Sequence, residues 1–285
     1  MSWDVNIDNN SLKGVHGGTL LEHSLDGLLT WPSVKSVDTN DWAEESGIEV
    51  DLSELHFNAR TAAFDIHFKT YGELSAFMEA IKANACQDWG FPFLGGAATR
   101  LRVTNAVTSY GNEFCVLGLS LVEDKFDCLG MGASDQPRSG SDTTCRVDNV
   151  PLSAYGVRLI NDPYSGLLTP GAVKPHLIRT NKLMDGNDYA ATLDGAAYPH
   201  VMGSHHFSIP CFMTGRPADV ALNSFSLFRF LTRTDEGADL MARKQRHIVV
   251  DGHGADCYYQ SMNITSLYLD QSKTWLTFNI NFVKI

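Results

Sequence analysis

Gly27-Leu28-Leu29-Thr30, followed by Val34-Lys35, returns as Gly166-Leu167-Leu168-Thr169, followed by Val173-Lys174 at the same spacing. The second stretch begins 139 positions after the first. Self-similarity at this offset predicts two tandem copies of one structural unit. Further short matches keep the same order in both halves: Asp8-Asn9 with Asp148-Asn149, Leu12 with Leu152, Thr39-Asn40 with Thr180-Asn181, Phe64-x-Ile66 with Phe207-x-Ile209, Val107-Thr108-Ser109 with Ile264-Thr265-Ser266, and residues 114–122 with 275–283.

Length and composition fit two globular domains. A chain of 285 residues is long enough for about two domains that each bury a core. The hydrophobic fraction of 44% and the charged fraction of 19% are those of an ordinary globular protein. Glycine, serine and aspartate are frequent between the two halves, as in a linker. The predicted organisation is therefore a first domain over 1–124, a linker over 125–146 and a second domain over 147–285.

Each half is expected to be β-rich with a single helix. Residues 64–68 alternate apolar and polar, as in a half-buried strand. Thr70 and Glu73 have the spacing of a capping box, and an apolar stripe then predicts a helix over 71–84. In the second half, Pro217 suits a first helical turn. The predicted class is β-rich α+β, two small β-barrel or sandwich domains each carrying one amphipathic helix. Further strands are expected over 89–94, 101–107, 114–122, 207–213, 262–269 and 274–283, with Ile248-Val249-Val250 in the place of Phe91-Pro92-Phe93.

An acidic segment over 38–51 is the candidate functional surface. Ser46-Gly47 supplies a turn signal within it, so a hairpin or long loop is expected. A tryptophan within such a segment is a candidate contact for another protein. The residues of this candidate surface are Asp38, Asp41, Trp42, Glu44, Glu45, Glu49 and Asp51.

Charge, cysteine spacing and hydropathy argue against a nucleic-acid-binding protein, a disulfide or zinc framework, and a membrane protein. The formal net charge of −11 argues against sequence-specific binding of nucleic acid, which needs clustered Lys and Arg. The six cysteines form no Cys-x-x-Cys pair, so reduced thiols are expected rather than a disulfide framework or a zinc site. No apolar run approaches the ~20 residues of a membrane helix, so no membrane insertion is expected.

No catalytic motif is recognised, and no catalytic residue, cofactor or metal site is predicted. The chain has no Gly-x-Ser-x-Gly elbow, no Walker loop and no His-Glu-x-x-His. The best candidate is the segment 251–257, where Asp251, His253 and Asp256 are metal-ligand types. A glycine-rich turn between two strands explains the same residues. A metal-assisted hydrolase that uses this loop is kept as one alternative function.

Tryptophans suggest a second alternative. Trp31 or Trp42 could form an exposed binding face of a carbohydrate- or surface-binding β-sandwich. Trp89 and Trp275 lie on predicted strands, where core or hairpin packing is expected.

Adjacent His205 and His206 point to opposite faces of a strand, so they are not expected to bind one metal ion together.

The order of elements resembles a known family. Each half has a β-rich lead, a long loop that in the first half is acidic, a strand such as 60–69, an amphipathic helix such as 71–83 and two or three closing strands. This order resembles the tail-tube fold of bacteriophages and related injection machines, particularly the ring domains of distal tail and baseplate hub proteins. The duplication departs from distal tail rings, which generally use one such domain in each of six subunits, and is closer to hub proteins in which three subunits supply six domains.

The resemblance implies a structural role rather than an enzymatic one. It implies a component of a phage or prophage tail that forms a trimeric or hexameric ring around a DNA channel. Its partners would be further copies of itself and other tail or baseplate proteins. It would be located in the tail of the virion after assembly in the cytoplasm of the bacterial host. The acidic segment would face the channel or a neighbouring ring.

Overall fold

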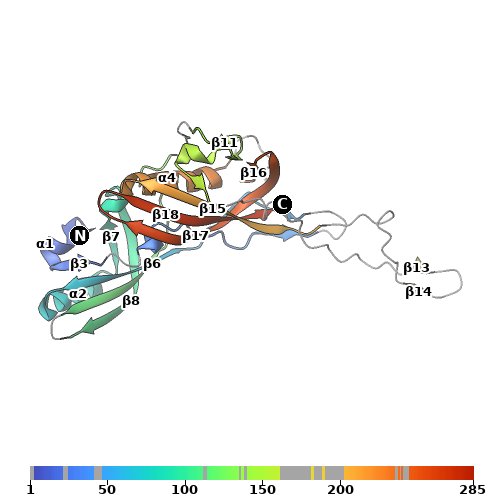
Figure 1. Ribbon diagram of the computed structural model, residues 1–285. Coiled ribbons are helices and arrows are strands. Elements are labelled where there is room, and N and C mark those ends of the chain that lie inside the picture. The colour runs from blue at the N-terminus through green and yellow to red at the C-terminus, as the bar shows by residue number, and fades with distance from the viewer. Residues whose placement is uncertain are drawn as a thin grey trace.

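The computed structural model describes residues 3–21, 25–41, 47–111, 114–134, 136–137, 140–160, 181–182, 188–189, 202–234, 237, 239 and 244–285. The first half forms a seven-stranded sheet in the order β2-β1-β7-β8-β9-β6-β3 (Figure 1). Among the described residues β2 and β3, at the two ends of this order, pair with one strand each, so the sheet is open rather than a closed barrel. Its elements are β1 (Asn6–Ile7), β2 (Asn10–Ser11), α1 (Leu12–His16), β3 (Gly18–Leu20), η1 (Asp26–Leu28), β6 (Arg60–Phe68), α2 (Tyr71–Ala83), β7 (Cys86–Gly90), η2 (Pro92–Leu94), β8 (Ala98–Tyr110) and β9 (Cys115–Glu123).

The second half forms a second seven-stranded sheet with the same order of elements, β11-β10-β16-β17-β18-β15-β12. Two further pairs of short strands lie outside the sheets: β4 (Thr39–Asn40) pairs with β5 (Glu49–Val50), and β13 (Asn181–Lys182) with β14 (Asp188–Tyr189). The elements of the second half are β10 (Cys145–Val147), β11 (Val150–Pro151), η3 (Leu152–Tyr155), β12 (Arg158–Leu159), β15 (His205–Gly215), α4 (Pro217–Thr232), β16 (Arg246–Val250), β17 (His253–Leu269) and β18 (Thr274–Lys284).

Both halves begin with the same turn. Asp8 and Asn9 have positive φ angles of 46° and 67°, and Asp148 and Asn149 have 49° and 66°. These two residue types tolerate the left-handed region better than most. The Asp8 carboxylate accepts a hydrogen bond from the backbone of Asp88, and the Asp148 carboxylate accepts one from His247. The matched pairs in the sequence therefore have the same conformation and the same role.

The strand pairing allows positions in the two sheets to be compared. We call two residues corresponding when they hold the same place in the two sheets. Trp89 pairs with Ile7, and Ile248 pairs with Val147. Continuing across the sheets, Val122 pairs with both Thr61 and Arg102, whereas Val283 pairs with both His206 and Tyr258. The correspondence therefore relates Val122 to Val283, Arg102 to Tyr258, Gln87 to Arg246 and Thr61 to His206.

Three of the sequence matches are corrected by this register. Phe64 pairs with Leu119 and Ile209 pairs with Ile280, so Phe64 corresponds to Ile209, two residues from the expected partner Phe207. Residues 248–250 correspond to 89–91, two positions before the expected 91–93. Val107 pairs with Gly118 and Asn263 pairs with Asn279, so Val107 corresponds to Asn263, one residue before the expected Ile264. Short apolar pairs recur every second residue in a strand, so such a match can slip by two without changing the face of the sheet.

The strand expected over 89–94 ends early. β7 stops at Gly90, and Pro92 opens the 3-10 helix η2, which ends at Gly95 with a φ of 81°. Proline has no backbone N–H to donate to a neighbouring strand, and glycine adopts positive φ without strain. The remaining strands, the helix with its Thr70–Glu73 capping box, and the helix that starts at Pro217 occur as expected.

The two helices have different surroundings. Leu74, Phe77 and Ile81 form the buried stripe of α2, which lies at the outer end of the first sheet (Figure 1). Helix α4 lies against β15, β17 and β18 of its own sheet and also contacts η2 of the first half. Burial therefore extends around α4, including Ser224 and Ser226 as well as its apolar residues. One hydrophobic core runs through both halves.

The segment between the two sheets packs onto the protein. Phe126 contacts Phe225 and Phe228 of α4 with ring centroids 5.3 and 5.4 Å apart. The Arg229 guanidinium donates a hydrogen bond to the Ala133 carbonyl. The expected domain limits at 124 and 147 remain a prediction.

No helix in the described part of the chain is long and apolar enough to cross a membrane.

All six cysteines are free. Burial raises the pKa of Cys145 to about 12 and that of Cys211 and Cys257 well above the ordinary thiol value. These thiols therefore stay protonated at neutral pH, as is typical of cysteines that serve as small core residues.

Candidate assembly surface

The acidic segment forms the predicted hairpin. Thr39 pairs with Val50, and Asn40 pairs with Glu49. Asp38, Asp41 and Glu49 are exposed and Asp51 is half-buried. A hollow is lined by Asp38, Thr39, Asn40, Glu49 and Asp51. Trp42, Glu44 and Glu45 lie outside the described residues.

Hydrogen bonding orders the base of this hairpin. The Asp51 carboxylate accepts a hydrogen bond of 2.9 Å from the backbone of Ser53, and the Asp51 backbone donates to the Asp38 carbonyl. Hydrogen bonds from Ser53 lower the pKa of the Asp51 carboxyl below its ordinary value. The carboxylate is therefore ionised at neutral pH, and the hollow has a negative rim.

Residues 32–58, which connect η1 to β6, form what we call the arm. Its apolar side covers the outer face of the second sheet. Val50 and Leu52 are buried against Tyr258 and Val283, and Val37, Ile48, Leu55 and Ile285 pack around this cluster. The first half therefore covers part of the second, while Asp38, Asp41 and Glu49 of the arm are exposed.

The arm also crosses the edge of β17. The Val34 N–H donates a 2.8 Å hydrogen bond to the Gln260 carbonyl, and the Tyr259 hydroxyl donates one of 3.0 Å to the Pro32 carbonyl. Gln260 is the extra residue of a β-bulge, because the pairing with β18 shifts between Tyr259 and Ser261. Within the described residues, the pairing of β17 with β16 ends at Cys257, so this edge of β17 is not paired with β16 from there on. An unpaired strand edge is a natural joining surface.

Trp31 fixes the start of the arm. It is 2% exposed, and its indole N–H donates a 2.8 Å hydrogen bond to the Ser224 hydroxyl of α4. Its ring packs against Phe228, Tyr259 and Phe278. Trp31 is therefore a core residue at the junction of the halves, and the expectation that it could form an exposed glycan-binding face is wrong. Trp89 is also buried, and Trp275 stacks on Tyr268 with centroids 5.8 Å apart.

A buried ion pair lies at the same junction. The Arg60 guanidinium is 2.5 Å from the Glu123 carboxylate, and both side chains are 3% exposed. Arg60 also donates to the Leu28 carbonyl and lies 4.5 Å over the ring of Phe126. Burial lowers the pKa of Arg60 and raises that of Glu123, while the contact between them opposes both shifts. The pair joins β6 and β9 to η1 and to the segment that leads into the second half.

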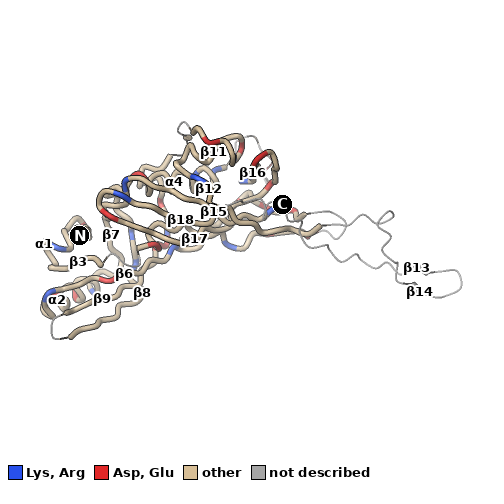
Figure 2. The backbone as a smooth tube through the Cα atoms, viewed as in Figure 1, with Lys and Arg blue, Asp and Glu red and all other residues tan. Residues whose placement is uncertain are grey.

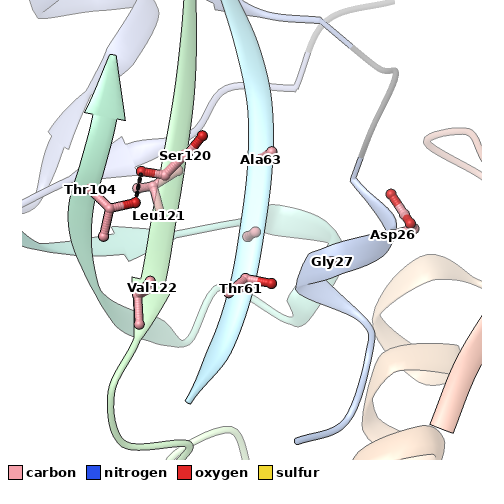
Figure 3. Close-up of a pocket in the computed structure, with 9 residues that line it drawn as sticks. Asp26, Gly27, Thr61, Ala63, Thr104, Ser120, Leu121 and Val122 are labelled. Atoms are coloured by element: carbon pink, nitrogen blue, oxygen red, sulfur yellow. Dashed lines mark hydrogen bonds between the residues drawn. The ribbon is translucent and has the colours of Figure 1, made fainter. Parts of the chain in front are cut away.

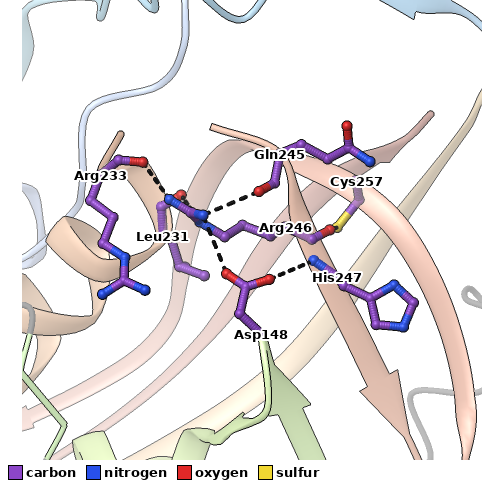
Figure 4. Close-up of polar contacts among 7 residues, drawn as sticks. All are labelled: Asp148, Leu231, Arg233, Gln245, Arg246, His247 and Cys257. Carbon is purple, nitrogen blue, oxygen red and sulfur yellow. Dashed lines mark hydrogen bonds and ion pairs between the residues drawn. The ribbon is translucent and has the colours of Figure 1, made fainter. Parts of the chain in front are cut away.

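Arg246 plays a comparable part in the second half. Its buried guanidinium donates to the carbonyls of Leu231 and Arg233 at the end of α4, and its Nη1 atom lies 3.2 Å from the Asp148 carboxylate (Figure 4). A cation is favoured at a helix C-terminus, where carbonyl groups have no partners within the helix. Arg246 therefore ties the helix to the turn at Asp148.

The outer face of the second sheet carries hydrogen-bonded neutral side chains. Asn281 of β18 contacts Ser208 of β15 and both Ser261 and Asn263 of β17. Thr265 and Thr277 share a 2.8 Å hydrogen bond. Charged residues are absent along the middle of β17 and β18, which Figure 2 shows in tan. A surface whose polar groups satisfy one another can be covered by protein without leaving a buried charge unpaired.

Aromatic rings are exposed at the start of α2 and near the tips of the two long hairpins. Tyr71 and Tyr110 lie 6.0 Å apart between ring centroids in the first half and are 64% and 67% exposed. Tyr268 is 47% exposed in the second half. Exposed aromatic residues are enriched at protein–protein contacts.

The segment 251–257 is a turn followed by a strand. Asp251 and Gly252 have positive φ angles of 44° and 85° and connect the paired residues Val250 and His253. His253 and Asp256 are an odd number of residues apart on β17 and so lie on opposite faces. Asp256 instead contacts His247, 2.7 Å from its ring. Within the described residues, no three His, Cys, Asp or Glu side chains gather in a metal-binding arrangement.

The comparisons with known proteins gave one kind of match. No protein-family model matches the sequence, and no curated protein matches it. Among solved structures, the chain is similar to the crystal structure of the SPP1 Dit (gp 19.1) protein, described as a paradigm of the hub adsorption apparatus in phages that infect Gram-positive hosts. The alignment covers 99% of this chain and 98% of that one, with 10% sequence identity and a TM-score of 0.33. Similarity at this level does not assign the chain to a family.

Proposed function

We propose that the protein is a non-enzymatic structural component of a phage or prophage tail, forming a distal tail or baseplate hub ring around a DNA channel. The observation that carries the proposal is the presence of two open sheets with the same order of seven strands in one chain. Each sheet has one long helix after the strand that corresponds to β6, and each begins with the same Asp-Asn turn. We attribute this arrangement to tandem duplication.

Repeated units of one chain can join head to tail. The arm of the first half covers the face and the strand edge of the second half. Contacts of this kind join different surfaces of two similar units, and they close into a ring when the rotation between units allows it. The contact inside this chain is thus the type of contact from which a ring of such units would be built.

The charge of the protein suits a channel through which DNA moves. The net charge is −11, and the hollow at the arm hairpin is lined by Asp38, Glu49 and Asp51. Carboxylates at a channel wall repel phosphate groups, so DNA would pass without binding in a sequence-specific way. The exposed tyrosines of the hairpin tips offer contacts for other tail or baseplate proteins.

The test is mass photometry together with negative-stain electron microscopy of the concentrated protein. The proposal predicts rings of three or six subunits with a central hole, and a ring of three would supply six sheets. Particles of another kind, such as closed dimers without a hole, would contradict the ring.

A further inference from the structure

The two sheets contain the same β-bulge. In the first sheet, the pairing of β8 with β9 shifts between Val103 and Asn105, so Thr104 is the extra residue. In the second sheet, Gln260 is the extra residue between Tyr259 and Ser261. The register relates Arg102 to Tyr258 and Val122 to Val283, so Thr104 corresponds to Gln260. Bulges mark places where a strand is re-aimed or where its pairing ends.

The bulge at Gln260 is covered by the arm. Val34 donates its N–H to the Gln260 carbonyl, and the neighbouring outer face is sealed by Val50 and Leu52. Val283 is only 2% exposed as a result. The Lys244 ammonium donates a 3.1 Å hydrogen bond to the Ser53 carbonyl and holds the far side of the arm.

The bulge at Thr104 is open. Its hydroxyl donates a 3.0 Å hydrogen bond to the Ser120 carbonyl, and in the described part of the chain no hydrogen bond from outside the sheet reaches the Thr104 carbonyl. Val122 is half-buried, in contrast to Val283. A hollow lies here on the outer face of the sheet (Figure 3). It is lined by Asp26, Gly27, Thr61, Ala62, Ala63, Thr104, Ser120, Leu121 and Val122.

This hollow has the properties of a docking surface for a chain segment. Apart from Asp26, its lining consists of uncharged residues, which can be covered without trapping a charge. The pairing of β8 with β7 ends at Arg102, so the edge of β8 is free from Thr104 onward within the described residues. Arg102, the cross-strand partner of Val122, forms a two-armed ion pair with Asp124 with both contacts at 2.7 Å.

The order of the chain identifies the occupant. The arm of the first half is the connection that leads to β6, and it covers the half that follows it in the sequence. In the second half, the same connection runs from β12 to β15, residues 160–204, and contains the paired strands β13 and β14 as the arm contains β4 and β5. In a head-to-tail series, the half that follows the second one is the first half of another copy.

We propose that the β12–β15 connection of a second copy of this chain docks on the first sheet at the Thr104 bulge and over the hollow at Val122. The contact repeats between chains what the arm does within one chain. This inference deepens the proposed ring by naming the surface through which subunits join.

Two variants test the docking contact in a way that does not need a ring. The first carries Val122→Glu, which places a carboxylate in the hollow but leaves the connection intact. The second replaces residues 163–199 by a flexible Gly-Ser linker and leaves the hollow intact. Circular dichroism and thermal unfolding verify that both are folded. Sedimentation velocity should show each variant alone as a monomer and their mixture as a 1:1 complex.

The matched controls add one charge elsewhere. Ser75→Glu lies on the exposed side of α2, so the linker variant with this change should still bind the Val122→Glu chain. The linker variant that also carries Val122→Glu should bind at least about 100-fold more weakly, because docking would bury an unpaired carboxylate. A mixture of folded variants that forms no complex, or a complex unaffected by the added Val122→Glu, would overturn the proposal.

The two proposals can fail separately. Rings that persist when every subunit carries Val122→Glu would leave the proposed function in place and refute this docking surface. A 1:1 complex of the two variants, without rings of the unaltered protein, would support the docking surface and count against the ring.

Discussion

Helices α2 and α4 hold the same place in their sheets but differ in what surrounds them. α2 has one buried stripe and an exposed side that includes Ser75. α4 is buried around most of its circumference, because the first half covers the side that its own sheet leaves open. The difference shows that an interface has been built on one of two similar units. The ends of the two helices are also stabilised by different means.

The C-terminal end of α4 should give the largest effect. Arg246→Leu removes the donors to Leu231 and Arg233 and leaves Asp148 without its ion-pair partner. We expect a loss of about 3–5 kcal/mol in the free energy of unfolding, measured by urea denaturation. The corresponding residue Gln87 is buried, and its side-chain oxygen has no hydrogen-bond partner among the described residues. Gln87→Leu should therefore be neutral or slightly stabilising. Equal losses of stability in Arg246→Leu and Gln87→Leu would contradict the expected difference between the two halves.

The contact between α4 and the arm should give the next largest effect. Ser224→Ala leaves the indole N–H of Trp31 buried without a partner. The expected loss is about 1–2 kcal/mol in the free energy of unfolding. Ser75→Ala, on the exposed side of α2, should change stability by no more than about 0.5 kcal/mol. The tryptophan fluorescence maximum should also shift in the first variant and not in the second.

The N-terminal ends of the helices offer a smaller contrast. The Thr70 hydroxyl accepts a hydrogen bond from Glu73 in a complete capping box, whereas Arg216 at the start of α4 makes no capping bond. Thr70→Ala should lower the free energy of unfolding by about 1 kcal/mol. Arg216→Ala should cost only a few tenths, because its ion pair with Asp219 is exposed. Thermal unfolding of both variants measures the two losses of stability. A larger loss for Arg216→Ala than for Thr70→Ala would contradict the prediction.

The smallest expected effect is a pH dependence of stability caused by His16. His16 packs on Phe77 of α2 with ring centroids 5.2 Å apart, and Tyr155 packs on Phe230 of α4 at the same distance. Partial burial lowers the pKa of His16 from its ordinary value of 6.5. The unfolded chain then binds more protons, so stability is complete above pH 6.5 and falls as the pH drops through this value toward the lowered pKa.

His16 and Tyr155 each precede a left-handed glycine, Gly17 with a φ of 71° and Gly156 with a φ of 75°. His16→Tyr should remove this part of the pH dependence, because it places the residue type of the second half at the matching position. Urea denaturation at a series of pH values between about 5 and 8 measures it. A variant whose stability has the same slope with pH as the unaltered protein would show that His16 does not cause it.

The sequence predicts much of the local structure and little of the contact between the halves. The Asp8-Asn9 and Asp148-Asn149 turns, the Thr70–Glu73 box and the alternating strand over 60–68 depend on neighbours in sequence, so their patterns can be read directly. η2 was missed although Pro92 and Gly95 supplied the signal.

The assembly surface depends on residues far apart in the chain. Val50 and Leu52 are buried by Tyr258 and Val283, which lie about 200 positions later, and no local pattern shows which face of a sheet such residues will cover. The acidic pattern drew attention to the arm but not to its apolar side. Likewise, Trp31 in a loop resembled an exposed binding residue, and only its contact with Ser224 shows that it belongs to the core.

A map of the assembled protein by electron cryomicroscopy would show what covers Thr104 between subunits. The surface that is covered within one chain at Gln260 should be covered between chains at Thr104. We expect density for the β12–β15 connection of one subunit across Thr104 and Val122 of the next, around a central hole. An assembly in which Thr104 and Val122 face solvent, or contact a different element, would contradict it.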